Sequence, residues 1–234
     1  MTMEKILIAQ GTKPDKTLDD IKKRANKLQI SMKEVRKQEL DAMSDHGAHQ
    51  GVIALAAPFR FTAIEEIIKR TKDAPDSLVI VLDHITDPGN LGAIVRSAEV
   101  IGAAGVVIPK RRMAAISPVA WKASAGAFAH VAVAQETNVA RALIKLKDGG
   151  FWVAGASEHA TQDVWRAPLN GKIALVMGSE GEGLARLTQQ TCDFLVKLPQ
   201  VGNVGSLNVA QATTAISYEW LRRIQLKAGQ NVGE

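Results

Sequence analysis

Residues 78–90 read LVIVLDHITDPGN, five apolar residues followed by a polar, turn-forming segment. The apolar run does not alternate with polar residues, which is typical of a strand covered on both faces. Pro-Gly-Asn favours a turn, and Asn90 is a residue type that often caps the helix after such a turn. The stretch therefore predicts a buried strand that leads through a loop into a helix.

The same arrangement recurs along the second part of the chain. Further apolar runs lie at residues 106–108, 151–154, 173–177 and 194–198, each ending at or near a proline or glycine. Buried strands that alternate with helices predict an α/β fold with a parallel sheet. Ligands of such sheets bind outside the carboxyl ends of the strands, so we expect the functional loops there.

The first part of the chain has a different pattern. Residues 6–9 and 51–56 read as strands and residues 16–28 as a helix. A further helical pattern at 62–72 is broken by Asp73-Ala74-Pro75-Asp76-Ser77. We therefore expect a small α/β domain at 1–60, a linker helix within 61–76 and a larger domain at 77–228.

Composition narrows the class of protein. Of the 234 residues 46% are hydrophobic and 23% are charged, as in soluble globular proteins, and the net charge of +5 favours an anionic partner.

The single cysteine, Cys192, rules out an internal disulfide, and we interpret it as structural. No signal peptide and no apolar run of ~18 residues is present, so we expect a cytoplasmic protein without a membrane span. His46 and His49 lack a third ligand at metal-binding spacing, so no metal is expected.

Three loops could carry chemistry. Asn90 and Arg96 flank the start of one predicted helix, with Arg96 on the same side as Gly92. Gly178-Ser179-Glu180-Gly181-Glu182-Gly183 follows a strand, but its spacing fits neither the dinucleotide fingerprint nor a P-loop. Its two glutamates disfavour a phosphate and suit a ligand with a hydroxyl or amine. In the third loop we expect Ser206 to be the N-cap of the last helix, which would place Asn208 unfavourably inside it; such a residue is a functional candidate.

At these loops the sequence resembles the SpoU (TrmH) family of RNA ribose methyltransferases. The three family motifs are similar to Asn90-x-Gly92-x-x-x-Arg96, to residues 176–183 and to Ser206-Leu207-Asn208-Val209, in that order. Within the family the RlmB-type enzymes are most similar, through residues 49–54 and 124–127. Two departures stand out: we expect the first strand and helix of their N-terminal domain to be absent, and Gly205 replaces a small hydroxyl residue.

The resemblance implies a parallel-sheet SPOUT domain with a C-terminal trefoil knot, preceded by a shortened, L7Ae-like α/β RNA-binding domain. It implies S-adenosyl-L-methionine as the cofactor, a homodimer to which the last helix contributes, and a guanosine ribose in the peptidyl-transferase region of 23S ribosomal RNA as the substrate. The catalytic residues would be Arg96, Asn90, Glu180, Ser206 and Asn208. The cofactor would be held at Met177, Gly178, Gly183, Leu198 and Leu207.

RNA phosphates would be contacted first by Lys110, Arg111 and Arg112, a basic run at the end of a predicted strand. With 4% aromatic residues, recognition by RNA shape is favoured over a base-stacking platform. Alternatives stay open: a tRNA ribose methyltransferase, a resistance enzyme that methylates ribosomal RNA, or a non-catalytic RNA-binding protein. A metal-dependent hydrolase is the least favoured.

Overall fold

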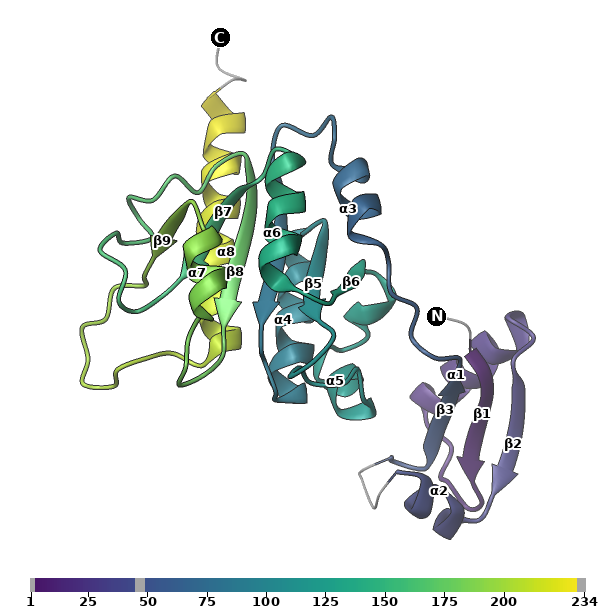
Figure 1. The fold of residues 1–234 in the computed structure, drawn as a ribbon. Helices are drawn as coiled ribbons and strands as arrows, with labels where there is room; N and C mark the ends of the chain where they lie inside the picture. The colour runs from purple at the N-terminus through teal and green to yellow at the C-terminus, as the bar shows by residue number, and fades with distance from the viewer. Residues whose placement is uncertain (1–2, 45–48, 231–234) are drawn as a thin grey trace. The chain divides into compact units, whose positions relative to one another are not determined.

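The computed structural model describes residues 3–44 and 49–230, and the chain forms two compact units, residues 1–60 and 61–234 (Figure 1). The first unit contains a three-stranded sheet in the order β2-β1-β3, with β2 parallel and β3 antiparallel to β1. Each face of this sheet has a small core: Ile6 and Ile8 pack with Leu18 on one face, and Leu7 packs with Leu40 on the other. The elements are β1 Met3–Ala9, α1 Lys16–Lys27, β2 Ser31–Val35, α2 Lys37–Met43 and β3 Val52–Ala56.

The second unit is built on a six-stranded sheet in the order β6-β5-β4-β8-β7-β9, in which every neighbouring pair is parallel. All seven residues of the central strand β4 are buried, as the unbroken apolar run predicts. The elements are α3 Ile64–Arg70, β4 Ser77–Asp83, α4 Pro88–Ile101, β5 Gly105–Pro109, α5 Pro118–Ala123, β6 Val133–Glu136, α6 Val139–Asp148, β7 Trp152–Ala156, β8 Lys172–Gly178, α7 Arg186–Thr191, β9 Phe194–Val196 and α8 Val209–Gln230.

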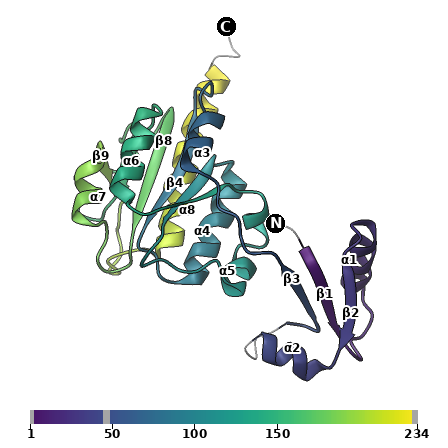
Figure 2. The same cartoon turned by 45° about the vertical axis from the view of Figure 1, so that its right-hand side comes forward.

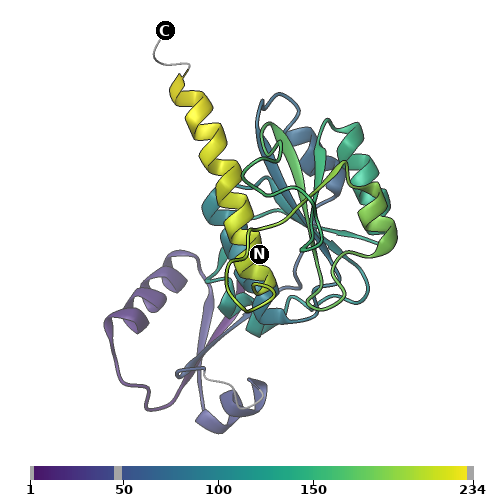
Figure 3. The ribbon, with the colours of Figure 1, turned by 90° about the vertical axis from the view of Figure 1, so that its left-hand side faces the viewer.

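Helices cover both faces of the six-stranded sheet. Helices α3, α6 and α7 lie on one face, and α4, α5 and α8 lie on the other (Figures 2 and 3). Helix α3, the expected linker, packs Ile64 and Ile67 into the core of the second unit, where both are fully buried. The predicted α/β class with a parallel sheet is confirmed. The trefoil knot and the L7Ae-like character of the first unit stay predictions.

The sequence patterns do not predict two of the strands. Strand β2 reads SMKEV and buries only Val35, and β6 reads VAQE with two buried residues, so neither forms an apolar run. They are edge strands of their sheets, where little of a strand's surface is covered by the core. No helix of the described residues is long and apolar enough to cross a membrane.

Three neighbouring strands bring the first two candidate loops and the basic run after β5 to one edge of the sheet. Strands β5, β4 and β8 are adjacent and parallel, so their carboxyl ends, at Pro109, Asp83 and Gly178, lie side by side. The loop after β5 is tied to the loop after β4 by a hydrogen bond from the Ala114 N–H to the Ile85 carbonyl (2.8 Å). This edge is where a parallel sheet places its ligand.

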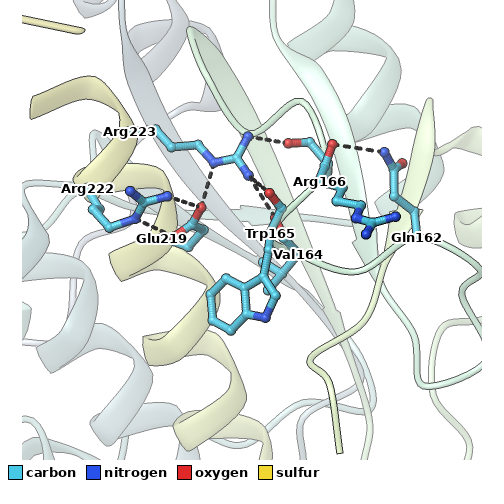
Figure 4. A network of polar contacts seen from close by, with 8 residues as sticks. Gln162, Val164, Trp165, Arg166, Glu219, Arg222 and Arg223 are labelled. Atoms are coloured by element: carbon cyan, nitrogen blue, oxygen red, sulfur yellow. Dashed lines mark hydrogen bonds and ion pairs between the residues drawn. The ribbon is translucent and has the colours of Figure 1, made fainter. Parts of the chain in front are cut away.

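The last helix is anchored to the long connection between β7 and β8 through Arg223, which Glu219 holds in place (Figure 4). The Glu219 side chain is only 3% exposed and accepts hydrogen bonds from Arg222 (2.8 Å) and Arg223 (2.7 Å). The Arg223 guanidinium also donates to the carbonyls of Val164 (3.1 Å) and Trp165 (2.7 Å). The hydrogen bonds from the two arginines lower the pKa of Glu219.

We expect Glu219→Gln to lower the free energy of unfolding by about 2 kcal/mol at pH 7, because hydrogen bonds to charged groups are worth roughly 1.5–3 kcal/mol. Since the folded-state pKa lies below that of an unfolded glutamate, about 4.3, the ionised group stabilises the fold above that pH, and its contribution is lost as the pH falls through the lowered pKa. Urea unfolding of both proteins at pH 7 and pH 3 tests this. A difference as large at pH 3 as at pH 7 would contradict it.

Candidate active site

Three side chains from distant parts of the sequence meet in one hydrogen-bonded network. One carboxylate oxygen of Glu180 accepts hydrogen bonds from Asn90 Nδ2 (3.1 Å), Asn208 Nδ2 (2.8 Å) and the Val209 N–H (3.2 Å). Asn208 Nδ2 also donates to Asn90 Oδ1 (2.9 Å). The network joins the loop after β8 to the first turns of α4 and α8. Glu180 and Asn208 are exposed at this edge, and Asn90 is half-buried.

The helix caps differ from those expected. Asp87, and not Asn90, is the N-cap of α4, since its carboxylate accepts a hydrogen bond from the Asn90 N–H (2.6 Å). Asn208, and not Ser206, caps α8: its Oδ1 accepts from the Ala210 N–H (2.9 Å) and its carbonyl from the Ala212 N–H (2.9 Å). The prediction that Asn208 lies unfavourably inside the helix is therefore wrong. Its side chain does two things at once, because Oδ1 caps α8 while Nδ2 binds Asn90 and Glu180.

The glycines of the second loop close a tight hairpin. Ser179 and Gly183 pair through two backbone hydrogen bonds of 3.0 Å each, and Gly181 and Gly183 have positive φ angles of 97° and 67°. A Cβ atom at Gly178 would lie 2.2 Å from the backbone of Gly183. Any side chain at Gly178 would therefore open the hairpin that presents Glu180.

Gly92 serves helix packing. A Cβ atom there would lie 2.3 Å from the Ala120 carbonyl oxygen of α5. A glycine can let a ligand approach the backbone closely, but at Gly92 the close neighbour is α5.

The loop before α8, residues 198–207, has backbone groups that are available to a ligand. Within the described part of the chain, no hydrogen bond involves the backbone N–H or C=O groups of residues 198–207. The apolar side chains of Val201 and Leu207 are 100% and 51% exposed. Leu198 and Leu207, two of the predicted cofactor residues, thus border a loop that offers free backbone donors and acceptors beside apolar surface.

The remaining predicted catalytic residues stand apart from the network. Arg96 is exposed on α4, and Ser206 is exposed in the loop before α8; neither side chain forms a hydrogen bond or ion pair among residues 3–44 and 49–230. A guanidinium without an internal partner at a ligand-binding edge is available to bind an anion. Lys110, Arg111 and Arg112 are likewise exposed, directly after β5 at the same edge of the sheet.

Asp83 is a residue whose role the sequence does not reveal. It ends β4, is fully buried, and accepts a hydrogen bond from the Ala185 N–H (2.8 Å), which ties the end of β4 to the segment after the Glu180 hairpin. His84 Nδ1 lies 2.6 Å from its other oxygen. In the sequence, the feature that points to Asp83 is a carboxylate at the end of an otherwise apolar strand.

Other reactive groups take no part in this site. Burial raises the pKa of Cys192 to about 12, which agrees with a structural role. His49 is bound to Asp41, and no group of three potential metal ligands occurs among the described residues. His46 lies outside them.

Comparisons with known proteins identify the family. The SpoU rRNA Methylase family matches residues 77–218, and the family of RNA 2'-O ribose methyltransferase substrate-binding domains matches residues 1–62. A protein of Staphylococcus aureus (strain MSSA476), assigned to the TrmH family of tRNA/rRNA methyltransferases, is 40% identical over 222 residues, 94% of this chain and 89% of the relative. The chain belongs to the SpoU family of RNA methyltransferases.

Solved structures show the same fold. An AdoMet-bound rRNA methyltransferase from Sinorhizobium meliloti aligns with a TM-score of 0.77 and 20% identity, covering 95% of this chain and 80% of that one. A TrmH/SpoU tRNA-modifying enzyme from A. aeolicus aligns with a TM-score of 0.58 and 24% identity, covering 70% of this chain and 86% of that one. At these identities the likeness concerns the fold.

Proposed function

We propose that this protein transfers a methyl group from S-adenosyl-L-methionine to a ribose 2'-hydroxyl of ribosomal RNA, with a guanosine of the peptidyl-transferase region of 23S RNA as the target. The observation that carries the proposal is the network of Asn90, Glu180 and Asn208. It unites the three family motifs at the carboxyl edge of the sheet. The match of residues 77–218 to the SpoU rRNA Methylase family supports rRNA as the substrate.

The loop before α8 fits this cofactor. Adenine is planar and carries both donors and acceptors, which the free backbone groups near Leu198 and Leu207 can match. Exposed Leu207 offers an apolar surface for the ring. Met177 ends the buried part of β8, and Gly178 and Gly183 keep the hairpin beside it closed. We assign these five residues to cofactor binding.

The protein must orient a weak nucleophile. When bound, S-adenosyl-L-methionine supplies an electrophilic methyl group on its sulfonium. On methyl transfer to the ribose oxygen, the proton of that hydroxyl would pass to the neighbouring phosphate or to water. The guanidinium of an arginine offers hydrogen-bond donors and no acceptor, so Arg96 binds that phosphate and stabilises the developing alkoxide instead of acting as a base. Asn90, Glu180, Ser206 and Asn208 position the ribose.

The basic run after β5 should govern the salt dependence of RNA binding. We expect replacement of Lys110, Arg111 and Arg112 by Gln to reduce the slope of log Kobs against log salt by about 2, since each phosphate contact contributes roughly 0.7–0.9. Filter binding at several salt concentrations measures this slope. The matched control replaces Lys69, Arg70 and Lys72, which precede β4 at the opposite edge of the sheet. An equal change in both variants would mean that the loop after β5 is not a specific contact.

We also propose that the protein forms homodimers. Tyr218 on α8 is 48% exposed, and Leu207 before that helix is 51% exposed. Together with Ala215 and Leu221, which also lie on α8, they would face the second copy. Sedimentation of the wild type and of Tyr218→Glu tests this, since a buried charge at the interface should favour the monomer.

Mapping of 2'-O-methyl groups in RNA from cells with and without the gene tests the substrate. Loss of one ribosomal methyl group that purified protein restores in the presence of S-adenosyl-L-methionine is the expected result. Loss from a tRNA instead would establish the alternative substrate. No lost methyl group in either RNA would overturn the proposal.

A further inference from the structure

The first unit contains a cavity of about 240 Å³. Three segments line it: the end of β1 with the turn that follows (residues 9–12), Lys37 at the start of α2, and residues 49–51 before β3. Pockets that enclose whole small-molecule ligands commonly measure ~300–1,000 Å³. This one therefore suits a smaller group, of the size of a single heterocyclic ring system.

The wall formed by residues 49–51 is held rigidly. The His49 side chain is 7% exposed; its Nε2 lies 2.9 Å from Asp41 Oδ1, and its Nδ1 accepts a hydrogen bond from the Gly51 N–H (3.0 Å). Between them Gln50 has a φ of 51°, a left-handed conformation that non-glycine residues rarely adopt. A Cβ atom at Gly51 would lie 2.7 Å from Thr12 Oγ1, so only glycine fits there. Backbone strain that the surroundings enforce is a feature of binding sites.

The chemistry of the lining is specific. The exposed side chains of Gln10 and Gln50 form no hydrogen bond within the described part of the chain, and each carboxamide offers two donors and an acceptor. Carboxamides pair in this way with the edges of nucleobases. Lys37 is exposed, forms no ion pair with any described residue, and no carboxylate lines the cavity. Two free amides beside one cation suit a neutral planar ring attached to an anionic group.

We propose that this pocket binds one unpaired nucleobase of the RNA substrate. Gln10 and Gln50 would form hydrogen bonds with the base, and Lys37 would bind the phosphate attached to it. The proposal rests on the proposed function, because it requires an RNA substrate. Sequence-specific recognition of RNA generally targets bases that are splayed out of single-stranded loops and hydrogen-bonded at their edges. The family match of residues 1–62 to substrate-binding domains agrees with this location.

Titration of the isotope-labelled full chain with each of the four nucleoside 5'-monophosphates tests the pocket directly by NMR. We expect the amide signals of Gly11, Thr12, Gln50 and Gly51 to shift with at least one of them. They should shift much less with ribose 5-phosphate or inorganic phosphate, which lack the base. Equal shifts with ribose 5-phosphate, or no shift with any nucleotide, would overturn the proposal.

Gln50→Gly tests the role of the pocket in catalysis. Glycine accepts a positive φ, so the variant should unfold at the same or a higher denaturant concentration while it loses one amide contact. We expect the KM for rRNA to rise roughly 10-fold with kcat unchanged. Gln29→Gly is the matched control, since Gln29 is also exposed with a φ of 53° but does not line the pocket.

The outcomes separate the two proposals. If the wild type methylates rRNA and Gln50→Gly retains the wild-type KM, the pocket does not bind substrate. If the wild type methylates no RNA at all, the proposed function fails, and the nucleotide titration still decides whether the pocket binds a base.

Discussion

Arg96→Lys should lower kcat by about 100-fold or more while the protein remains folded. Lysine keeps the positive charge but loses the planar fork that holds two oxygens of a phosphate. Loss of one preorganised donor to a developing oxyanion typically costs 10²–10³-fold in kcat. The Arg96 side chain forms no internal hydrogen bond or ion pair among the described residues, so its replacement should not disturb the fold.

Single-turnover methyl transfer to rRNA at saturating cofactor measures this effect. Arg141→Lys is the control, because Arg141 is also an exposed helical arginine but lies on α6, on the other face of the sheet. If the kcat of Arg96→Lys lies within a few-fold of the wild type, Arg96 does not bind two oxygens of the phosphate at once. Its role would then be a general electrostatic one.

Asn208→Asp should lower activity about 100-fold with little loss of stability. Aspartate caps a helix as well as asparagine does, so α8 keeps its first turn. The carboxylate, however, replaces the Nδ2 donor that lies 2.8 Å from Glu180 and 2.9 Å from Asn90 Oδ1. It places two like charges in contact, which should break the network and move Glu180.

Two further variants separate the roles of Asn208. Asn208→Ala should lose the network and also about 1 kcal/mol of stability, since it removes the cap as well. Asn138→Asp makes the same change at the N-cap of α6, where Asn138 accepts a hydrogen bond from the Arg141 N–H (3.0 Å), and should leave activity unchanged. If Asn208→Asp methylates RNA at the wild-type rate, the network does not position the substrate.

The sequence predicts the sheet well because its central strands are covered on both faces. Runs such as residues 78–82 and 173–177 can be buried only in that way, and they mark β4 and β8. The order of parallel strands then explains why loops 90 residues apart meet. The edge strands β2 and β6 contain no such apolar run, because few of their residues pack into a core.

The sequence predicts the candidate site less completely. Which residue caps a helix depends on where the backbone first becomes helical, so Asp87 and Asn208 could not be distinguished from Asn90 and Ser206 by residue type. The role of Gly92 depends on α5, whose approach no local pattern encodes. Asp83 acts through the Ala185 N–H, 102 residues along the chain, a contact that only the folded topology creates.

The state of Cys192 has a practical consequence. A thiol with a pKa of about 12 is almost wholly protonated at neutral pH, and the thiolate is the form that reacts with maleimides and iodoacetamides. Because the chain has one cysteine, a second one introduced at an exposed position would react far faster than the native thiol. Fluorophores or spin labels could then be attached at a chosen site in the wild-type background, without first replacing a half-buried residue in the core.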